Sequence, residues 1–275
     1  MNRFVTWLSC ALLFAAQPVH AQLYKPRPVT ALLGAFEPEL KLVRASLRHP
    51  KTRTINGISF TTGRVGRQRV VVAETGIGKV NAAATTAFVL AHFRPRRVLF
   101  TGIAGGTNPD LQPGDIVVGQ RVAHHDYGWI TMTTPQQPTR QTRNAITKQD
   151  NPAYFLADSV LLQRTQQAAK AVTFDPIPAT NRPPTLVVGT IVTGDVFVSS
   201  EEKVAQLRRD FGADATEMEG AAVAQICHQE QVPCLVIRSL SDKANSNART
   251  DMRTFLDIAA RNSAKLVLKL VEGLP

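Results

Sequence analysis

The chain has 275 residues, of which 44% are hydrophobic, 6% aromatic and 19% charged, the proportions of an ordinary globular protein. Its 17 glycines and 17 prolines exclude collagen-like and low-complexity classes, and three cysteines are too few for a disulfide scaffold. The unusual property is charge, because 32 Lys and Arg against 21 Asp and Glu give a formal net charge of +11. Such a charge invites comparison with proteins that bind nucleic acid or membrane surfaces.

Residues 1–21 have the pattern of a secretory signal peptide. Arg3 supplies a positive start, residues 4–16 form a mainly apolar run, and Val19 and Ala21 stand at the −3 and −1 positions of a cleavage site. The run is shorter than the ~20 residues that span a bilayer. We expect cleavage after Ala21 and export to the periplasm or the medium, and a retained interfacial anchor is the alternative. Residues 22–275 then form a soluble domain without an integral membrane segment.

Strands alternate with helices along the rest of the chain. Apolar runs and a hairpin predict strands at 28–33, 58–65, 68–74, 98–100, 116–118, 186–193 and 235–240. Helical spacing predicts helices at 80–94, 159–171, 201–209, 222–228 and 252–270. Residues 101–106 are expected to form a turn, and the polar stretch 131–152 a loop or a partner contact. This order predicts one α/β domain, a three-layer α/β/α sandwich around a mixed, twisted sheet.

Several familiar motifs fail on inspection. The stretch Gly-Ile-Gly-Lys (76–79) resembles a phosphate loop, but Val80 stands where that loop needs Ser or Thr, and Asn81 replaces the third glycine of a dinucleotide fold. The pair His124 and His125 has no second cluster of metal ligands, so neither a metal nor a cofactor is expected. A Gly-x-Ser-x-Gly elbow is absent from the sequence.

Four separated stretches that contain glycines, acidic residues or both look unusual, at 33–39, 101–106, 216–220 and 238–242. Three of them directly follow apolar strands, and ligands of α/β sheets gather at strand ends. If the four converge, they bring Glu39, Glu219, Arg238 and Asp242 together over a glycine-rich backbone. Helix caps and surface charges are the alternative interpretation. Burying a carboxylate at the end of an apolar strand costs free energy unless the charge has a partner or takes part in function. The pattern therefore favours a functional site.

These stretches resemble the 5′-methylthioadenosine/S-adenosylhomocysteine nucleosidases of the nucleoside phosphorylase/hydrolase superfamily. The most specific parts are Thr-Gly-Ile-Gly-Lys-Val (75–80), Gly-Asp-Val-Phe (194–197), Glu-Met-Glu-Gly-Ala-Ala (217–222) and Arg-Ser-Leu-Ser-Asp (238–242), within a match over roughly 28–270. The resemblance implies a homodimer without cofactor that hydrolyses the N-glycosidic bond of adenine nucleosides, methylthioadenosine, S-adenosylhomocysteine or both. It also implies a place in nucleoside catabolism and methionine salvage.

The resemblance assigns four catalytic roles. Asp242 matches the acid that protonates adenine N7, which is chemistry that a partly desolvated carboxyl with a raised pKa performs. Glu219 matches the carboxylate that holds the ribose hydroxyls and stabilises an oxocarbenium-like sugar. Glu39 matches the residue that orients and deprotonates the attacking water, and Arg238 the arginine near that water.

The resemblance also implies the substrate contacts. Phe197 would stack on adenine, the backbone of Val198 would pair with its polar edge, and the backbone of Ala104 and Gly105 would approach the base.

Met218 would pack beneath the ribose, and Phe255 would line the pocket for the 5′ substituent. Ordinary core packing is the alternative for Phe197, Met218 and Phe255, and it is strongest for Phe255, which belongs to the apolar stripe of the last helix. Two departures stand out. Ile103 occupies a position where some members have a water-binding Ser, and the 125–140 stretch, where members reach the 5′ tail across a dimer interface, matches poorly.

Two other functions remain open from the sequence. A phosphorylase commonly has an arginine just before the glycine-rich turn, but Leu-Phe-Thr (99–101) stands there, and Arg96 and Arg97 lie at the far end of that strand. A non-catalytic exported nucleoside-binding or storage protein has no need of Glu39, Glu219 and Asp242 together. Hydrolysis is therefore the favoured reading.

The remaining positive charge is scattered along the sequence. Its densest groupings, at 94–97 and 208–209, are short and lack interleaved aromatic residues. No nucleic-acid partner is expected, and the charge favours contact with anionic envelopes in an exported setting.

Overall fold

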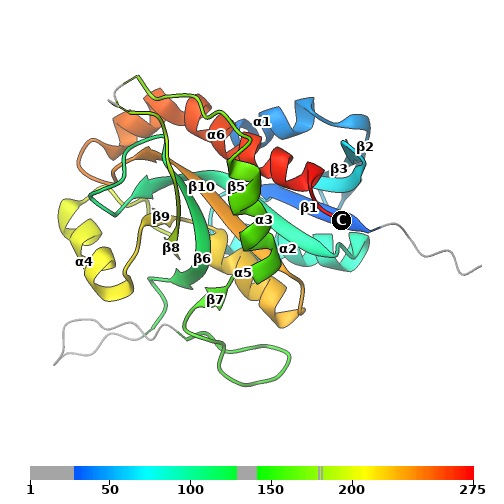
Figure 1. Ribbon diagram of the computed structural model, residues 1–275. Helices are drawn as coiled ribbons and strands as arrows, with labels where there is room; N and C mark the ends of the chain where they lie inside the picture. The colour runs from blue at the N-terminus through cyan, green and yellow to red at the C-terminus, as the bar shows by residue number, and fades with distance from the viewer. Residues whose placement is uncertain (1–27, 129–140, 179, 181) are drawn as a thin grey trace, which may run out of the picture.

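The computed structural model describes residues 28–128, 141–178, 180 and 182–275 (Figure 1). Its strands are β1 (Val29–Gly34), β2 (Arg48–Ile55), β3 (Ile58–Val65), β4 (Gln68–Glu74), β5 (Arg97–Gly106), β6 (Ile116–His124), β7 (Phe155–Leu156), β8 (Leu186–Thr193), β9 (Ala215–Glu217) and β10 (Cys234–Asp242). Its helices are α1 (Glu37–Ala45), α2 (Lys79–Phe93), α3 (Ser159–Ala169), α4 (Glu201–Phe211), α5 (Gly220–Gln229) and α6 (Ala248–Glu272).

The strands form one mixed sheet in the order β10-β6-β8-β9-β5-β1-β4-β3-β2. β1 is parallel to β4 and β5, whereas the β2–β3–β4 meander is antiparallel. β10 pairs with β6 and also, in parallel, with β5, so one half of the sheet closes on itself through β5, β10, β6, β8 and β9. The expected mixed sheet is confirmed. The closure was not predicted, because pairing partners leave no mark on hydrophobic periodicity.

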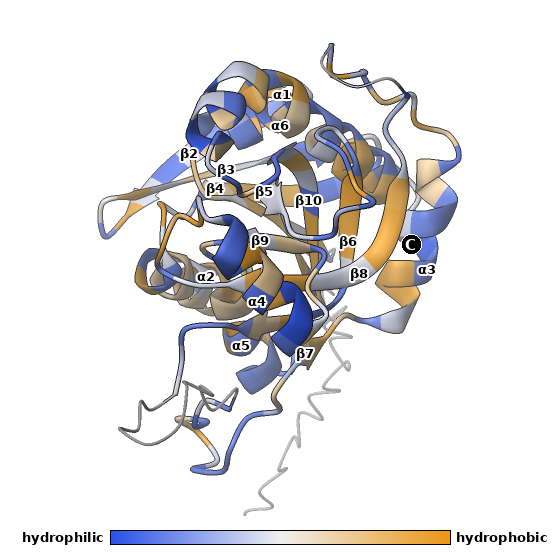
Figure 2. Ribbon diagram, turned by 90° about the vertical axis from the view of Figure 1, so that its left-hand side faces the viewer, coloured by the Kyte–Doolittle hydropathy of each residue, from blue (hydrophilic) through white to orange (hydrophobic). Residues whose placement is uncertain are grey.

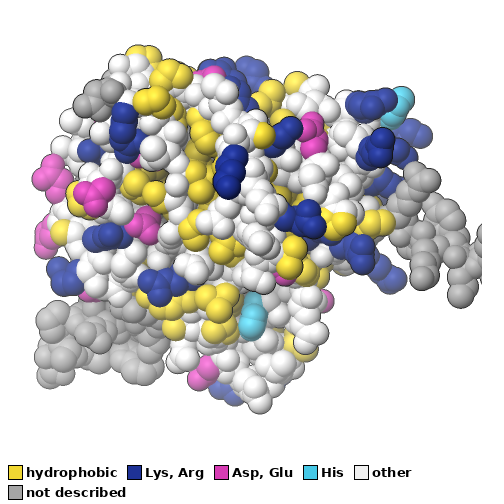
Figure 3. Space-filling view, in the orientation of Figure 1, with side chains coloured by type: hydrophobic (Ala, Val, Ile, Leu, Met, Phe, Trp, Pro, Cys, Tyr) yellow, Lys and Arg dark blue, Asp and Glu magenta, His cyan; other side chains and the backbone are white. Residues whose placement is uncertain are grey.

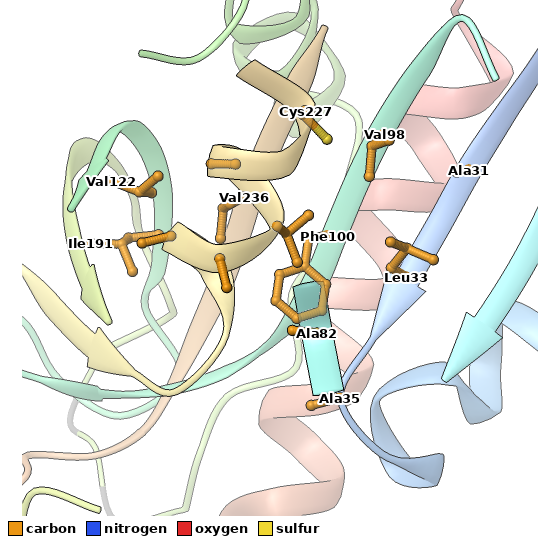
Figure 4. Close-up of a cluster of buried hydrophobic side chains, with 14 of the residues drawn as sticks. Ala31, Leu33, Ala35, Ala82, Val98, Phe100, Val122, Ile191, Cys227 and Val236 are labelled. Carbon is orange, nitrogen blue, oxygen red and sulfur yellow. The ribbon is translucent and has the colours of Figure 1, made fainter. Parts of the chain in front are cut away.

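Two cores lie on opposite faces of the sheet, because successive side chains of a strand point to opposite faces. On β5, Val98 and Phe100 join the core beneath α2 and α5, while Leu99 joins the core beneath α1, α3 and α6. β1 alternates in the same way, with Leu33 in the first core and Leu32 in the second. Figure 4 shows the first core around Phe100, and Figure 2 shows apolar strands between amphipathic helices. The three-layer arrangement follows from this alternation.

The structure corrects the sequence reading in three places. The segment 101–106 is not a turn but the continuation of β5 to Gly106. The elements α1 and β2 were not predicted. α1 has only nine residues, with Pro38 in its first turn, and β2 is exposed along almost its whole length, so it lacks the alternation that identifies a half-buried strand.

The short strands β7 and β9 were not predicted either, and β6 continues to His124 beyond its predicted end at 118. The other elements agree within a few residues at their ends. The last helix is longer than expected and begins at Ala248. The first part of the predicted loop, 131–140, lies outside the described residues, and in 141–152 Arg143 and Asp150 form an isolated bridge. Cys227 and Cys234 are free thiols. In the part of the chain that is described, no helix is long and apolar enough to cross a membrane.

Candidate active site

The carboxyl ends of three parallel strands meet at one cavity. β1 ends at Gly34 and leads into α1, β5 ends at Gly106, and β10 ends at Asp242, which is in register with Gly105. The cavity has a volume of about 320 Å³. It is lined by Phe36, Glu39, Ile77, Ile103, Ala104, Gly105, Val196, Phe197, Val198, Thr216, Glu217, Met218, Glu219, Ser241, Asp242, Met252, Arg253 and Leu256. The four stretches singled out in the sequence therefore converge.

Asp242 is poised as an acid at the end of β10. Its carboxyl accepts hydrogen bonds from the Ser241 hydroxyl (2.7 Å) and from the Ala244 N–H (2.7 Å). Burial raises the pKa of Asp242 to about 6, although both hydrogen bonds act in the opposite direction. A carboxyl that titrates in this range is available as a proton donor near neutral pH.

Arg238 lies on β10, four residues before Asp242, and is fully buried. Its guanidinium packs over the Phe100 ring, 4.2 Å from the centroid, and donates a hydrogen bond to Glu217. The same guanidinium lies 3.5 Å from a Glu219 oxygen and 3.9 Å from a Glu39 oxygen. Arg238 does not line the cavity, so it acts on substrate only through the carboxylates that it holds.

Glu39 reaches the cavity from the first turn of α1. One carboxyl oxygen accepts a hydrogen bond from the Ala35 N–H (2.5 Å), and the other accepts one from the Ile103 N–H (2.9 Å). Burial raises the pKa of Glu39, and the charge of Arg238 partly opposes that rise. The carboxyl is fixed from two sides and 2% exposed, which suits a group that holds one water molecule.

Gly102 makes the meeting of Glu39 and Arg238 possible. A Cβ atom at this position would lie 2.1 Å from the Arg238 Nη1 and 2.1 Å from the Glu39 Oε1. Both atoms are packed and neither is free to move aside. Glycine is therefore required here for close approach rather than for a turn.

Glu219 precedes α5 and faces the start of α2. Its Oε1 accepts a hydrogen bond from the Gly78 N–H (2.8 Å). Burial, reinforced by the neighbouring charge of Glu217, raises the pKa of Glu219 to about 8. A cation placed beside this carboxyl reverses that effect, because an opposite charge favours the ionised form.

Glu217 is the main residue that the sequence reading left without a role. Its carboxyl accepts hydrogen bonds from the Thr193 hydroxyl, from the N–H groups of Glu219 and Gly220, and from Arg238. These bonds use most of its capacity, so Glu217 positions Arg238 and the start of α5. The available signal was a second acid in the same Glu-Met-Glu motif, two residues before Glu219.

The predicted base-binding residues line the same cavity. Phe197 is 47% exposed at the mouth of the cavity, whereas Val198 is buried. Ala104 and Gly105 line the cavity at the carboxyl end of β5. A Cβ at Gly105 would lie 2.9 Å from an Asp242 oxygen, so the missing side chain leaves room beside the acid. Met218 also lines the cavity, between the two glutamates of its motif.

Phe255 is the one predicted binding residue that the structure places elsewhere. It does not line the cavity; Met252 and Leu256, one helical turn apart on α6, do so together with Arg253. The prediction used the aromatic residue of the helix, but the face directed to the cavity lies at 252 and 256. Ile103 lines the cavity with an apolar side chain, while its N–H binds Glu39.

Within the described ranges, no group of three His, Cys, Asp or Glu side chains is arranged to hold a metal ion. His124 contacts Gln225 (3.0 Å), and burial lowers the pKa of His125 to about 4.

Comparisons with known proteins agree with this geometry. A family model described as the phosphorylase superfamily matches residues 29–272. The 5′-methylthioadenosine/S-adenosylhomocysteine nucleosidase of Bacillus thuringiensis (strain Al Hakam) is 36% identical over 245 residues, which are 89% of this chain and 98% of that protein. The chain belongs to the 5′-methylthioadenosine/S-adenosylhomocysteine nucleosidase family of this superfamily.

Solved structures of similar proteins have the same fold as this chain. The nucleosidase of Neisseria meningitidis, in complex with methylthio-immucillin-A, has a TM-score of 0.75 and 36% identity, covering 90% of this chain and 99% of that one. The futalosine hydrolase of Helicobacter pylori has a TM-score of 0.77 and 28% identity, covering 90% and 98%. The predicted fold and family are thus confirmed. The individual residue roles rest on the geometry described above.

Ser241→Ala is expected to raise the pKa of Asp242 by about one unit, because a hydrogen bond that favours the carboxylate is lost. The carboxyl carbon of Asp242 can be titrated by NMR, with Asp242→Asn identifying its signal. Ser246→Ala, at an exposed position four residues after Asp242, is the control. An unchanged midpoint in Ser241→Ala would show that the hydroxyl does not stabilise the carboxylate.

Proposed function

We propose that this protein hydrolyses the N-glycosidic bond of adenine nucleosides, with 5′-methylthioadenosine and S-adenosylhomocysteine as substrates. The observation that carries the proposal is the convergence of Asp242, Glu39 and Glu219 on one cavity whose remaining walls are largely apolar. The two nucleosides in the name of the Bacillus thuringiensis relative select the substrates. Adenine and a thioribose are the products.

The geometry divides the chemistry among three carboxyl groups. Asp242, protonated in a fraction of molecules at neutral pH because its pKa is about 6, donates its proton to N7 of adenine as the glycosidic bond breaks. Water held by Glu39 attacks C1′ and gives its proton to that carboxylate. Glu219 lies beside the sugar, and the positive charge that develops there favours its ionised form, which stabilises the cation in return.

Water rather than phosphate is the nucleophile in this proposal. Arg253 is the only Lys or Arg among the residues that line the cavity, and it is on α6. Arg238, the nearest buried cation, is surrounded by the carboxylates of Glu39, Glu217 and Glu219. Among the described residues, a phosphate dianion beside the ribose would therefore meet the carboxylates of Glu39 and Glu219, with Arg253 as the one cation in the cavity wall.

Asp242→Asn is expected to lower kcat for adenine release at least 100-fold, because the amide donates no proton to N7. The measurement is adenine release from methylthioadenosine with and without phosphate. Asp257→Asn, on an exposed position of α6 that does not line the cavity, is the matched control.

Two results would contradict the proposal. A requirement for phosphate would make the enzyme a phosphorylase. Tight binding of the nucleoside by the unmodified protein with no adenine formed would favour a nucleoside-binding or storage protein.

We also propose that the protein is a homodimer that covers an apolar patch beside the cavity mouth. Ile77, Val80, Tyr127, Val196 and Phe197 are exposed by 43–79%. The segments that carry them are tied together, because Lys79 pairs with Asp126 (2.5 Å) and Asp126 accepts the Asp195 N–H (2.7 Å). An apolar patch of this kind is typical of a protein interface.

Val80→Asp is expected to convert the dimer to a monomer at micromolar concentration, because it places a charge in the apolar patch. Sedimentation velocity measures the change. Val160→Asp, at another exposed apolar position (54%) on α3, is the control. A protein that sediments as a monomer before any substitution would refute the dimer.

Export with cleavage after Ala21 is proposed from the sequence pattern of residues 1–21. The mass of the purified secreted protein is expected to correspond to residues 22–275. A product that retains Met1 would contradict cleavage and favour an anchor.

A further inference from the structure

A second hollow lies at the other ends of the strands from the nucleoside cavity, where β1, β4 and β5 begin. It is a groove of about 950 Å³. Its walls are Pro28, Val29, His49, Lys51, Thr62, Gly63, Arg64, Arg69, Val70, His92, Phe93, Arg94 and Arg96. Five of these are Lys or Arg, two are His and none is acidic. We call this the basic groove. Figure 3 shows Lys and Arg side chains gathered at the right of the molecule, around β2 and β3.

The sheet itself holds arginines in register at this edge. Arg48 on β2 is opposite Arg64 on β3, and Arg64 is opposite Arg69 on β4. Like charges directly opposite one another on neighbouring strands are destabilising. Arg69 is in turn opposite Val29, beside which the Arg96 N–H donates to the Val29 carbonyl. The fold thus gathers charges that are far apart in the sequence, at a cost to its own stability.

The cations of the basic groove have no acidic partners. Among the described residues, no ion pair involves Lys51, Arg64, Arg69, Arg94 or Arg96. The residues outside the described ranges include no Asp or Glu, so they offer these cations no acidic side chain either. The carboxyl end of α2 favours a cation and accounts for Arg94 alone. The charge on β3 and β4 has no structural explanation and suits an external anion.

Two observations favour a lipid surface over a nucleic acid. Phe93 is the only aromatic residue in the walls besides the histidines, and Arg53 already lies over its ring at 5.4 Å, so bases have no free stacking platform. The described chain also begins in the groove, at Pro28. Eleven residues, 17–27, separate it from the apolar run 4–16 and span at most about 40 Å. Before the proposed cleavage after Ala21, while that run is in a membrane, the groove is held near the lipid.

We propose that the basic groove is a docking surface for an anionic phospholipid membrane, independent of the nucleoside cavity. The anionic headgroups would lie along Arg64, Arg69, Arg94 and Arg96 at the amino ends of the strands. Each Lys or Arg near such a surface strengthens binding about fivefold at physiological salt, and salt weakens the effect.

The test compares two double variants of the full chain on vesicles. Arg64→Gln with Arg69→Gln removes two groove cations, and Lys41→Gln with Arg249→Gln removes two exposed cations of α1 and α6 that do not line the groove. Sedimentation with vesicles of phosphatidylglycerol and phosphatidylcholine is expected to show about 25-fold weaker binding for the groove variant. The control variant is expected to stay within about threefold of the unmodified chain, by loss of net charge alone.

Three results would overturn the proposal. Equal binding by the two variants would show that net charge, not the groove, is responsible. Equal binding to vesicles of phosphatidylcholine alone would assign the interaction to the apolar run. A single-stranded oligonucleotide that binds more tightly than the vesicles, and loses affinity in the groove variant, would identify a nucleic acid as the partner. The thermal midpoint of the groove variant, expected to equal or exceed that of the unmodified chain because Arg64 no longer faces Arg69, verifies folding.

Discussion

The buried ion cluster around Arg238 is the constraint on which the site depends. A cation that is fully enclosed is tolerated only when its charge is compensated, because the loss of hydration costs several kcal/mol. Glu217, Glu219 and Glu39 supply that compensation from three different elements, β9, the start of α5 and α1. The cluster therefore fixes the distances between the elements that surround the cavity. A change in any one carboxylate leaves the guanidinium less compensated and disturbs the others.

The cluster has more carboxyl groups than cations, and this imbalance bears on the proposed chemistry. One guanidinium faces three carboxyl groups, so burial raises the pKa values of Glu39 and Glu219 despite the arginine. A sugar that becomes positive is stabilised in this environment. Asp242 is not part of the cluster; its partners are Ser241 and Ala244. In the proposed reaction, the acid for the base and the carboxylates for the sugar therefore have different hydrogen-bond partners, and such different environments allow carboxyl groups of one site to take different roles.

The sequence was most informative where chemistry and periodicity coincide. The apolar runs predicted β1, β4, β8 and β10, and the expected convergence of the four unusual stretches predicted Glu39, Glu219 and Asp242 as neighbours in space. The sequence was least informative where the role of a residue depends on which side chains and strands lie next to it in the fold. Glu217 looks like Glu219 until its hydrogen bonds with Arg238 and Gly220 are known. The assignment of Phe255 failed because a helix stripe gives the buried face but not which residues on its edge border a cavity.

Pairing also explains why the positive charge looked scattered. Arg48, Arg64 and Arg69 are separated by turns in the sequence, and only the register of β2, β3 and β4 places them in one row. The carboxylates and the basic groove occupy opposite ends of the same strands. β1, from Val29 in the groove to Gly34 beside the cavity, spans about 17 Å. This is roughly twice the ~8 Å Debye length at physiological salt, so through solvent the groove is screened from the nucleoside site. A surface charge of either sign at the amino ends of the strands is therefore compatible with acid chemistry at their carboxyl ends.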